Sequence, residues 1–152
     1  MPVENLDALR QSLTPGQRLL GLDVGAKTVG LALSDPSLTV ASPMETLVRG
    51  KIGPLAEALQ AIIAEQDVGG LVLGLPVGMD GNEGPACQSV RQFAANLDDR
   101  MGLPMAFWDE RLSTAAVERF LVDEADMSRG RRARLIDKMA AAYILQGALD
   151  SL

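Results

Sequence analysis

The chain contains no histidine, and this absence excludes several kinds of catalytic chemistry. Ser-His-Asp and Cys-His catalysis, histidine-ligated zinc and a histidine general base are all ruled out. Cys87 is the sole cysteine, so the chain can form neither an internal disulfide nor a cysteine metal cluster, which suits a reducing cytoplasm. We therefore expect a cytoplasmic protein whose polar chemistry rests on carboxylates, lysine, arginine, hydroxyl groups and any hard metal ion that they bind.

Aromatic residues and long hydrophobic runs are also scarce. Three Phe, one Trp and one Tyr disfavour recognition of a ligand by stacked nucleobases. The longest apolar run, residues 68–77, is interrupted by glycines and is shorter than the roughly 18 residues of a membrane span. Residues 1–17 carry Glu4 and Asp7 and no apolar run, which predicts that they are not a signal peptide.

The composition is otherwise that of a folded domain. With 152 residues, 47% of them apolar, the chain is predicted to be one domain over residues 1–152, with residues 1–17 as an N-terminal extension containing a short helix. Its net charge of −6 is unfavourable for binding nucleic acid. However, five cations gather within ten residues: Arg129, Arg131, Arg132, Arg134 and Lys138. The whole-chain charge therefore does not decide the partner.

The hydrophobic pattern predicts an α/β fold. Strands are expected over residues 18–25, 28–34, 40–48, 69–77 and 104–110, and Pro43 favours an edge or a bulge for the third strand. Helices are expected after Pro54, over residues 85–101, after residue 113 and over residues 134–149, with a charged, mobile connection over residues 123–134. Three antiparallel strands followed by β-α-β crossovers form a mixed five-stranded sheet with helices on both faces.

Three carboxylates are conspicuous by their positions. Asp23 interrupts an apolar strand, Glu110 (or its neighbour Asp109) ends another, and Asp137 begins an apolar row along the last helix. A buried carboxylate costs several kcal/mol unless it is compensated, and three that converge also repel one another. Without histidine, the pattern favours oxygen-bound Mg²⁺ or Mn²⁺, with two ions roughly 3.5–4 Å apart as in phosphodiester hydrolysis.

Each of these carboxylates also has an ordinary structural interpretation. Asp23 alone would serve as a turn cap, Glu110 as an ion-pair partner of Arg111, and Asp137 as a charge favoured at a helix N-terminus. The hypothesis of a metal site therefore rests on the three together. Among the cations, Lys27 follows Asp23 in a turn and either holds a phosphate or is merely exposed.

The arginines leave similar alternatives. Arg111 either clamps a phosphate or pairs with Asp109, and Arg131 and Arg132 belong either to an arm that binds a nucleic-acid strand or to a solvated loop. Ser113 and Thr114 fit helix caps better than nucleophiles, because no base lies near them in the sequence.

Four segments together resemble the YqgF/RuvX family of RNase H-like nucleases. They are residues 21–35 (GLDVGAKTVGLALSD), 74–84 (GLPVGMDGNEG), 109–114 (DERLST) and 137–145 (DKMAAAYIL), in the order of the family's motifs. The resemblance implies an RNase H-like fold in which Asp23, Glu110 and Asp137 are the catalytic, metal-binding carboxylates. It also implies processing of the 5′ end of precursor 16S rRNA, with ribosomal precursor particles as partners. Resolution of Holliday junctions in branched DNA is the alternative activity.

One departure from the family's pattern lies in the second segment. Val77 and Gly78 stand where Leu-Asn is usual before Met-Asp-Gly, so Asp80 and Asn82 are the candidates to replace that asparagine's contact. Two other classes of protein compete with a nuclease: a sugar-kinase-like ATPase, disfavoured by the length of the chain, and a nucleic-acid-binding assembly protein without activity. The residues do not distinguish RNA from DNA, endonuclease from exonuclease action, or a monomer from a dimer.

Overall fold

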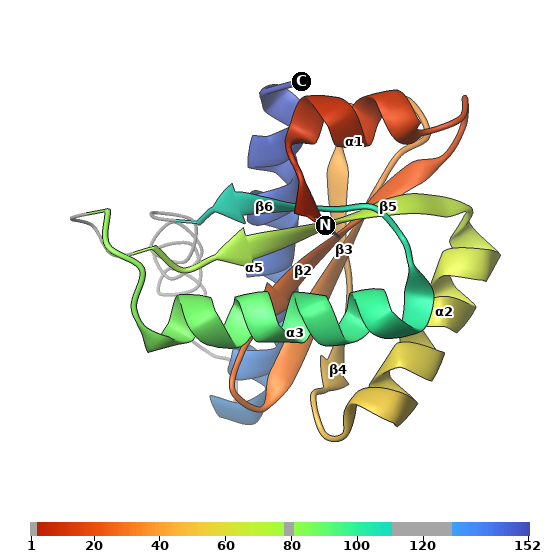
Figure 1. The fold of residues 1–152 in the computed structure, drawn as a ribbon. Helices are drawn as coiled ribbons and strands as arrows, with labels where there is room; N and C mark the ends of the chain where they lie inside the picture. Colours follow the sequence, from red (N-terminus) through yellow and green to blue (C-terminus); the bar gives the residue numbers. More distant parts are fainter. Residues whose placement is uncertain (1–2, 78–80, 111–128) are drawn as a thin grey trace.

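The computed structural model describes residues 3–77, 81–110 and 129–152, with residues 3–4 and 129–136 described by their backbone alone. Their central element is a mixed six-stranded sheet in the order β1-β6-β5-β2-β3-β4 (Figure 1). The strands are β1 (Val3–Glu4), β2 (Arg18–Val24), β3 (Thr28–Ser34), β4 (Ala41–Val48), β5 (Val68–Leu75) and β6 (Met105–Asp109).

The sheet confirms the five predicted strands and adds one. Strands β2, β3 and β4 form an antiparallel meander, and β5 and β6 are parallel to β2. The addition is β1, two residues long, which pairs in parallel with β6 at one edge. The strand that contains Pro43 is β4, at the other edge, and its pairing with β3 shifts register between Leu31 and Ala32, opposite Pro43. An edge and an irregularity are the two places where a sheet tolerates proline.

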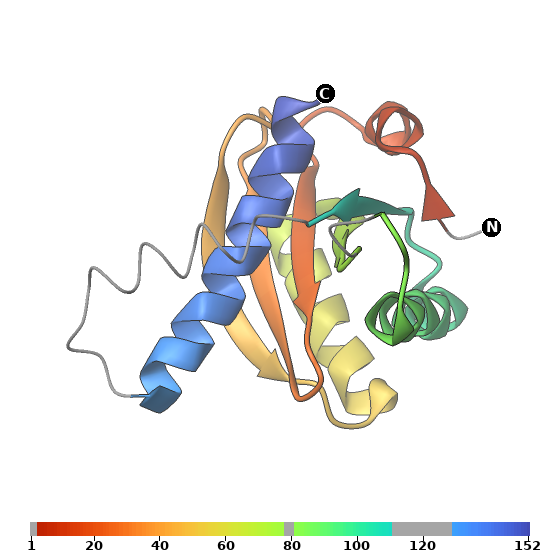
Figure 2. The same cartoon turned by 90° about the vertical axis from the view of Figure 1, so that its left-hand side faces the viewer.

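Helices cover both faces of the sheet, as the pattern predicts (Figure 2). They are α1 (Leu6–Ser12), α2 (Ile52–Gln66), α3 (Pro85–Met101) and α5 (Arg129–Asp150). The last helix begins at Arg129, five residues before the predicted start at residue 134, because arginine is a good helix former despite its charge. The expected mobile connection was therefore wrong over residues 129–134. The helix expected after residue 113 and residues 123–128 lie outside the described residues.

Two apolar clusters lie on opposite sides of the sheet, because successive strand residues point to opposite faces. On β2, Leu20 and Leu22 pack toward α2 and α3, whereas Leu19 packs toward α1 and α5. In Figure 1, α3 lies in front of the sheet and α5 behind it. Among the described residues, no helix has the length and apolar character needed to cross a lipid bilayer.

The parallel strands place their carboxyl ends at one edge of the sheet. Strand β5 pairs with both β2 and β6, so the ends of these three strands are neighbours. The backbone N–H of Glu110, just after β6, donates to the carbonyl of Leu75 at the end of β5 (3.2 Å). Residues that follow parallel strands at this edge are the usual place for a functional site.

Candidate carboxylate site

Asp23 lies near the end of β2, on the face of the sheet that α5 covers. Period-two alternation puts it on the same face as Leu19 and Gly21, and Gly21 lies against Leu145 of α5. Its cross-strand partner on β3 is Gly30. The carboxylate is therefore placed by a well-paired strand between a glycine and a helix, as its position within an apolar segment predicts.

Glu110 reaches the same place from the end of β6. A Cβ atom added to Gly74 on β5 would collide with Oε2 of Glu110 and with Ile144 of α5, so the glycine provides the space that this carboxylate occupies. Oε2 of Glu110 is buried and has no hydrogen-bond partner. An unpaired buried carboxylate oxygen is costly, and such an atom in a folded protein calls for an explanation such as an ion or a catalytic role.

Asp137 approaches from the opposite layer, on α5. The helix backbone passes so close to β3 that a Cβ atom on Gly30 would collide with the carbonyl group of Asp137. The Thr28 hydroxyl then donates a hydrogen bond of 2.6 Å to Oδ2 of Asp137. Because Gly30 is also the partner of Asp23, the same close approach brings the helix carboxylate beside the strand carboxylate.

Asp23 and Glu110 both have raised pKa values. Burial and then the charge of Asp137 raise the pKa of Asp23 to about 6, and a hydrogen bond with Glu110 partly offsets this rise. Burial, and next the charge of Asp23, raise the pKa of Glu110 to about 7. Two carboxyl groups in hydrogen-bonding contact must share a proton, so Asp23 and Glu110 form a pair that resists losing its second proton near neutral pH.

The structure therefore brings Asp23 and Glu110 into contact and places Asp137 next to Asp23. Within residues 3–77, 81–110 and 129–152, no three acidic or cysteine side chains already stand in the arrangement of a metal-binding group. Asp137 is turned to the Thr28 hydroxyl, and the other two carboxyl groups are turned to each other. The cluster has the oxygen atoms that a hard cation prefers.

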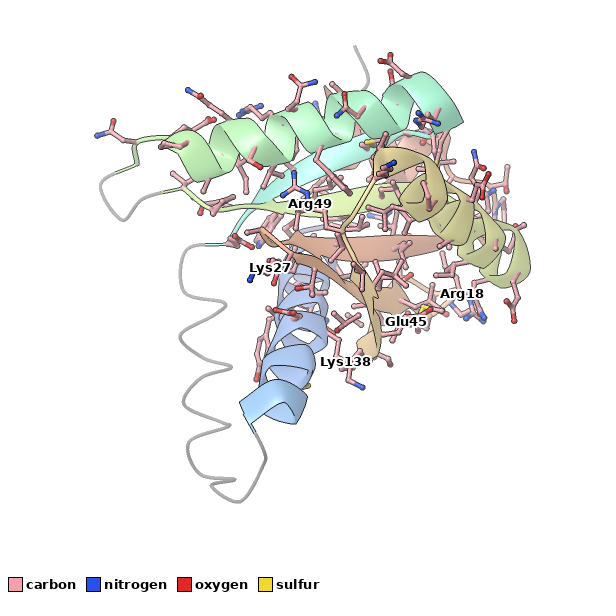
Figure 3. All side chains as sticks on the ribbon, turned by 90° about the horizontal axis from the view of Figure 1, so that it is seen from below. Arg18, Lys27, Glu45, Arg49 and Lys138 are labelled. Carbon is pink, nitrogen blue, oxygen red and sulfur yellow. The ribbon has the colours of Figure 1, made fainter. Side chains whose placement is uncertain are left out.

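The other predicted site residues are only partly described. Lys27 is exposed in the turn between β2 and β3, and Figure 3 shows it at the end of the sheet where α5 passes. Asn82 is exposed in the segment that leads into α3. Arg111 lies outside the described residues, as do the side chains of Arg131 and Arg132, whose backbone belongs to α5.

Sequence reasoning assigned no role to three residues that build the cluster. They are Thr28, which binds Asp137, and Gly30 and Gly74, which make room for Asp137 and Glu110. A signal for two of them exists: Thr28 and Gly30 lie on the small and polar face of a strand whose other face is apolar. Strands β2 and β3 pair in an antiparallel hairpin, so that small face had to lie beside Asp23.

The fold is RNase H-like, of the kind found in Holliday junction resolvases. The structure is similar to that of Thermus thermophilus RuvC in complex with a Holliday junction substrate (TM-score 0.52, 14% identity, 89% of this chain and 94% of that one). The fowlpox virus Holliday junction resolvase is similar to the same degree (TM-score 0.51, 8% identity, 89% and 99%). At these identities the likeness establishes the fold.

The chain belongs to the RuvX family, whose model, described as "Holliday junction resolvase", matches residues 17–151. It is 62% identical to a protein of Paramagnetospirillum magneticum over 99% of this chain and 97% of that one, and 55% identical to a protein of Gluconacetobacter diazotrophicus over 99% and 98%. Both relatives are named "Putative pre-16S rRNA nuclease". The predicted family and the nuclease class, and with it the nucleic acid as a partner, are confirmed.

Proposed function

We propose that Asp23, Glu110 and Asp137 are the catalytic carboxylates of a metal-dependent nuclease that processes the 5′ end of precursor 16S rRNA in the cytoplasm. The observation that carries this proposal is the buried Oε2 of Glu110, which has no hydrogen-bond partner and lies beside a second carboxyl group. The chain's membership of the RuvX family supports a nuclease, and the names of its relatives support the RNA substrate.

The donor atoms of the cluster fit Mg²⁺ or Mn²⁺. All three side chains offer carboxylate oxygens, the pair Asp23–Glu110 is a poor place for two negative charges without a cation, and the chain contains no histidine to select a softer metal. Asp23 interacts with both Glu110 and Asp137, and we propose that the three carboxylates hold a pair of ions. When bound, such ions activate a water molecule and stabilise the leaving oxygen of a phosphodiester.

The protein's own residues would hold and orient the nucleic acid. Lys27 is exposed in the turn that follows β2 (Figure 3), and Asn82 is exposed in the segment that leads into α3; we assign both to contacts with phosphates. We assign the same role to Arg111, Arg131 and Arg132 from the sequence, since an overall charge of −6 requires local cations at the substrate path.

A second candidate, resolution of Holliday junctions, is favoured by the description of the family model and by the resolvase fold. The two candidates share the same carboxylates and differ in the substrate. A symmetric four-way junction requires two active sites acting together, whereas a single RNA strand requires one.

The test compares metal-dependent cleavage of three substrates: a precursor 16S rRNA fragment with its 5′ extension, linear DNA and a four-way DNA junction. With Mg²⁺ or Mn²⁺ we expect the RNA to be cleaved by the wild type. Asp23→Asn should lower the rate by at least about 10³-fold, because an amide neither carries the charge nor accepts the ligand role of a carboxylate. Circular dichroism should show an unchanged fold.

The matched control is Glu45→Gln, which removes one negative charge from an exposed position of β4 away from the cluster (Figure 3). This variant should cleave like the wild type. Cleavage of the junction in preference to RNA would assign the second candidate. Equal cleavage by wild type and Asp23→Asn would reject the carboxylate site, and binding of RNA without cleavage or metal uptake would identify a non-catalytic assembly protein.

A further inference from the structure

Arg49 joins three parts of the molecule at the end of β4. Its Nη1 donates to the carbonyl oxygen of Gly25 (2.8 Å) and its Nη2 donates to Oγ of Ser89 on α3 (3.2 Å). The guanidinium lies over the ring of Phe93, 5.3 Å from the centroid, and Phe93 is buried in the core beneath α3. Figure 3 shows Arg49 between the β2–β3 end of the sheet and α3. The side chain of Arg49 therefore connects the end of β4 with the turn at Gly25 and with α3.

The backbone of Arg49 supports the same turn. Its N–H donates to the carbonyl of Lys27 (2.9 Å), so backbone and side chain together bind two of the four residues of the turn. The turn is closed by a hydrogen bond from the N–H of Gly25 to the carbonyl of Thr28 (2.8 Å). Its conformation therefore depends on Arg49 from outside the hairpin as well as on its own bond.

This turn begins two residues after Asp23 and ends at the residue that holds Asp137. Thr28 donates its hydroxyl hydrogen to Asp137, and Lys27 is the exposed cation between the two ends. A continuous series of contacts therefore leads from Phe93 and Ser89 through Arg49 and the turn to the carboxylate of Asp137.

We infer that Arg49 is a positioning residue, which fixes the Gly25–Thr28 turn so that Thr28 orients Asp137 and Lys27 faces the substrate. The part of this inference that concerns catalysis rests on the proposed function. The planar guanidinium suits the role, because it bonds two acceptors in fixed directions while stacking on a ring, which an ammonium group does not reproduce.

A direct phosphate contact is the competing role for this cation, and Arg49→Lys separates the two. Lysine keeps the positive charge but loses the planar pair of N–H donors. If Arg49 positions the turn, Arg49→Lys should therefore resemble Arg49→Ala. If Arg49 instead contacts a phosphate, Arg49→Lys should resemble the wild type. Arg100→Ala is the matched control, since it removes an exposed cation from the far end of α3 without touching the turn.

Two measurements are made on each folded variant. Hydrogen exchange of the Gly25 amide, in metal-free protein, should accelerate about tenfold or more in both Arg49 variants because the turn opens more often. In the cleavage assay, kcat should fall about tenfold with KM within about twofold of the wild type, since a small misplacement of a catalytic group lowers the rate more than binding. Arg100→Ala should match the wild type in both. Ser89→Ala, which removes a single anchor, should give a smaller change of the same kind.

Unchanged exchange at Gly25 in both Arg49 variants would overturn the inference, as would a wild-type rate in Arg49→Lys. An effect confined to KM and its salt dependence would assign a phosphate contact instead and would also overturn it. The exchange measurement needs no cleavage, so a wild type that cleaves no substrate would reject the proposed function while the role of Arg49 in the turn is still decided.

Discussion

The two faces of the sheet differ in the size of the strand residues that stand where the helices approach most closely. Toward α2 and α3 the sheet presents large apolar side chains, which are Leu20, Leu22, Leu31, Leu71 and Leu73. Toward α5 the strands place small residues where the helix approaches, which are Gly21, Gly30, Ala32, Gly74 and Ala106, and the helix contributes Ala141 and Ala148. Large side chains hold two layers apart, whereas glycine and alanine let the backbones approach.

We therefore associate the stabilising burial of large apolar side chains with the α2–α3 face and the carboxylate chemistry with the α5 face. Burial of leucine and phenylalanine on the α2–α3 face removes much apolar area from water, at about 25 cal/mol per Å². The α5 face contains the Asp23–Glu110 pair, whose burial opposes ionisation. Close approach on that face is what lets a carboxylate from a helix reach carboxylates from strands.

The largest loss of stability and of cleavage activity is expected from Gly30→Ala. The added methyl group would collide with the backbone of Asp137, which, unlike a flexible side chain, cannot rotate away. Overpacking of this kind should lower the free energy of unfolding by about 3 kcal/mol, and the displaced helix should also abolish cleavage. Urea denaturation and the cleavage assay measure the two effects.

The matched control is the same substitution on the other side of the sheet. Gly53 lies in the first turn of α2, and a Cβ atom there has the side chain of Arg100 as its nearest neighbour, at 3.8 Å. Gly53→Ala should therefore leave cleavage unchanged and alter stability by no more than about 0.5 kcal/mol, because the helix preference of alanine is opposed by Pro54, which disfavours helical backbone at the residue before it. If Gly30→Ala were as harmless as Gly53→Ala, the two faces would not differ in the way described.

The sequence alone was sufficient to predict the large-residue face. Leu55, Leu59 and Ile62 recur at helical spacing, and the near-continuous apolar run of β5 indicates burial on both sides, so strands and helices followed directly. The positions of Asp23 and Glu110 near strand ends, and of Asp137 at the head of an apolar row along the last helix, also distinguished these three residues.

The details of the small-residue face were not predictable in the same way. A glycine has no side chain whose polarity could indicate which way its position faces. The sequence therefore did not show that Gly30 makes room for Asp137 or that Gly74 makes room for Glu110. The hydrogen bond from Thr28 to Asp137 joins residues 109 positions apart, and Arg49 acts through contacts with Gly25 and Ser89 that only the tertiary structure creates. Such long-range pairs leave no local periodicity to detect.

A loss of stability of intermediate size is expected when the pH rises, and we expect it from the Asp23–Glu110 pair on the α5 face. The pKa values of Asp23 and Glu110 are raised to about 6 and about 7 by folding, so in acid the folded protein holds protons that the unfolded chain has lost. The stabilisation by these protons is complete below the unfolded pKa values and is lost as the pH rises through the folded ones. Between pH 5 and 8 the metal-free protein should therefore lose about 2 kcal/mol of stability.

Glu110→Gln and divalent cations sharpen this prediction. Glutamine removes one ionising member of the pair, so the variant should lose less stability over the same pH range. Mg²⁺ or Mn²⁺ added to the wild type at pH 8 should restore stability, and removal of the ion with a chelator should reverse this, because a ligand that binds only the folded state stabilises it. Thermal denaturation at several pH values measures both. An identical slope in wild type and Glu110→Gln would exclude this pair as the origin.

The smallest effect on stability is expected from Thr28→Val, which keeps the shape of the side chain and removes its hydroxyl. Without the 2.6 Å hydrogen bond, the carboxylate of Asp137 loses its only described hydrogen-bond partner, which should cost about 1 kcal/mol at this half-buried position. The effect on metal binding should be larger than that on folding: the Mn²⁺ concentration for half-maximal cleavage should rise about tenfold, since partners of ligating groups set the orientation of those groups.

Thr28→Ser distinguishes orientation from packing, because serine retains the hydroxyl and loses the methyl group. If the hydroxyl orients Asp137, the serine variant should require nearly the wild-type Mn²⁺ concentration, while valine should not. The reverse order would mean that Thr28 acts through its methyl contact with the sheet and helix. The close approach of α5 would then suffice by itself to orient Asp137, and the small-residue face would need no polar side chain of its own to do so.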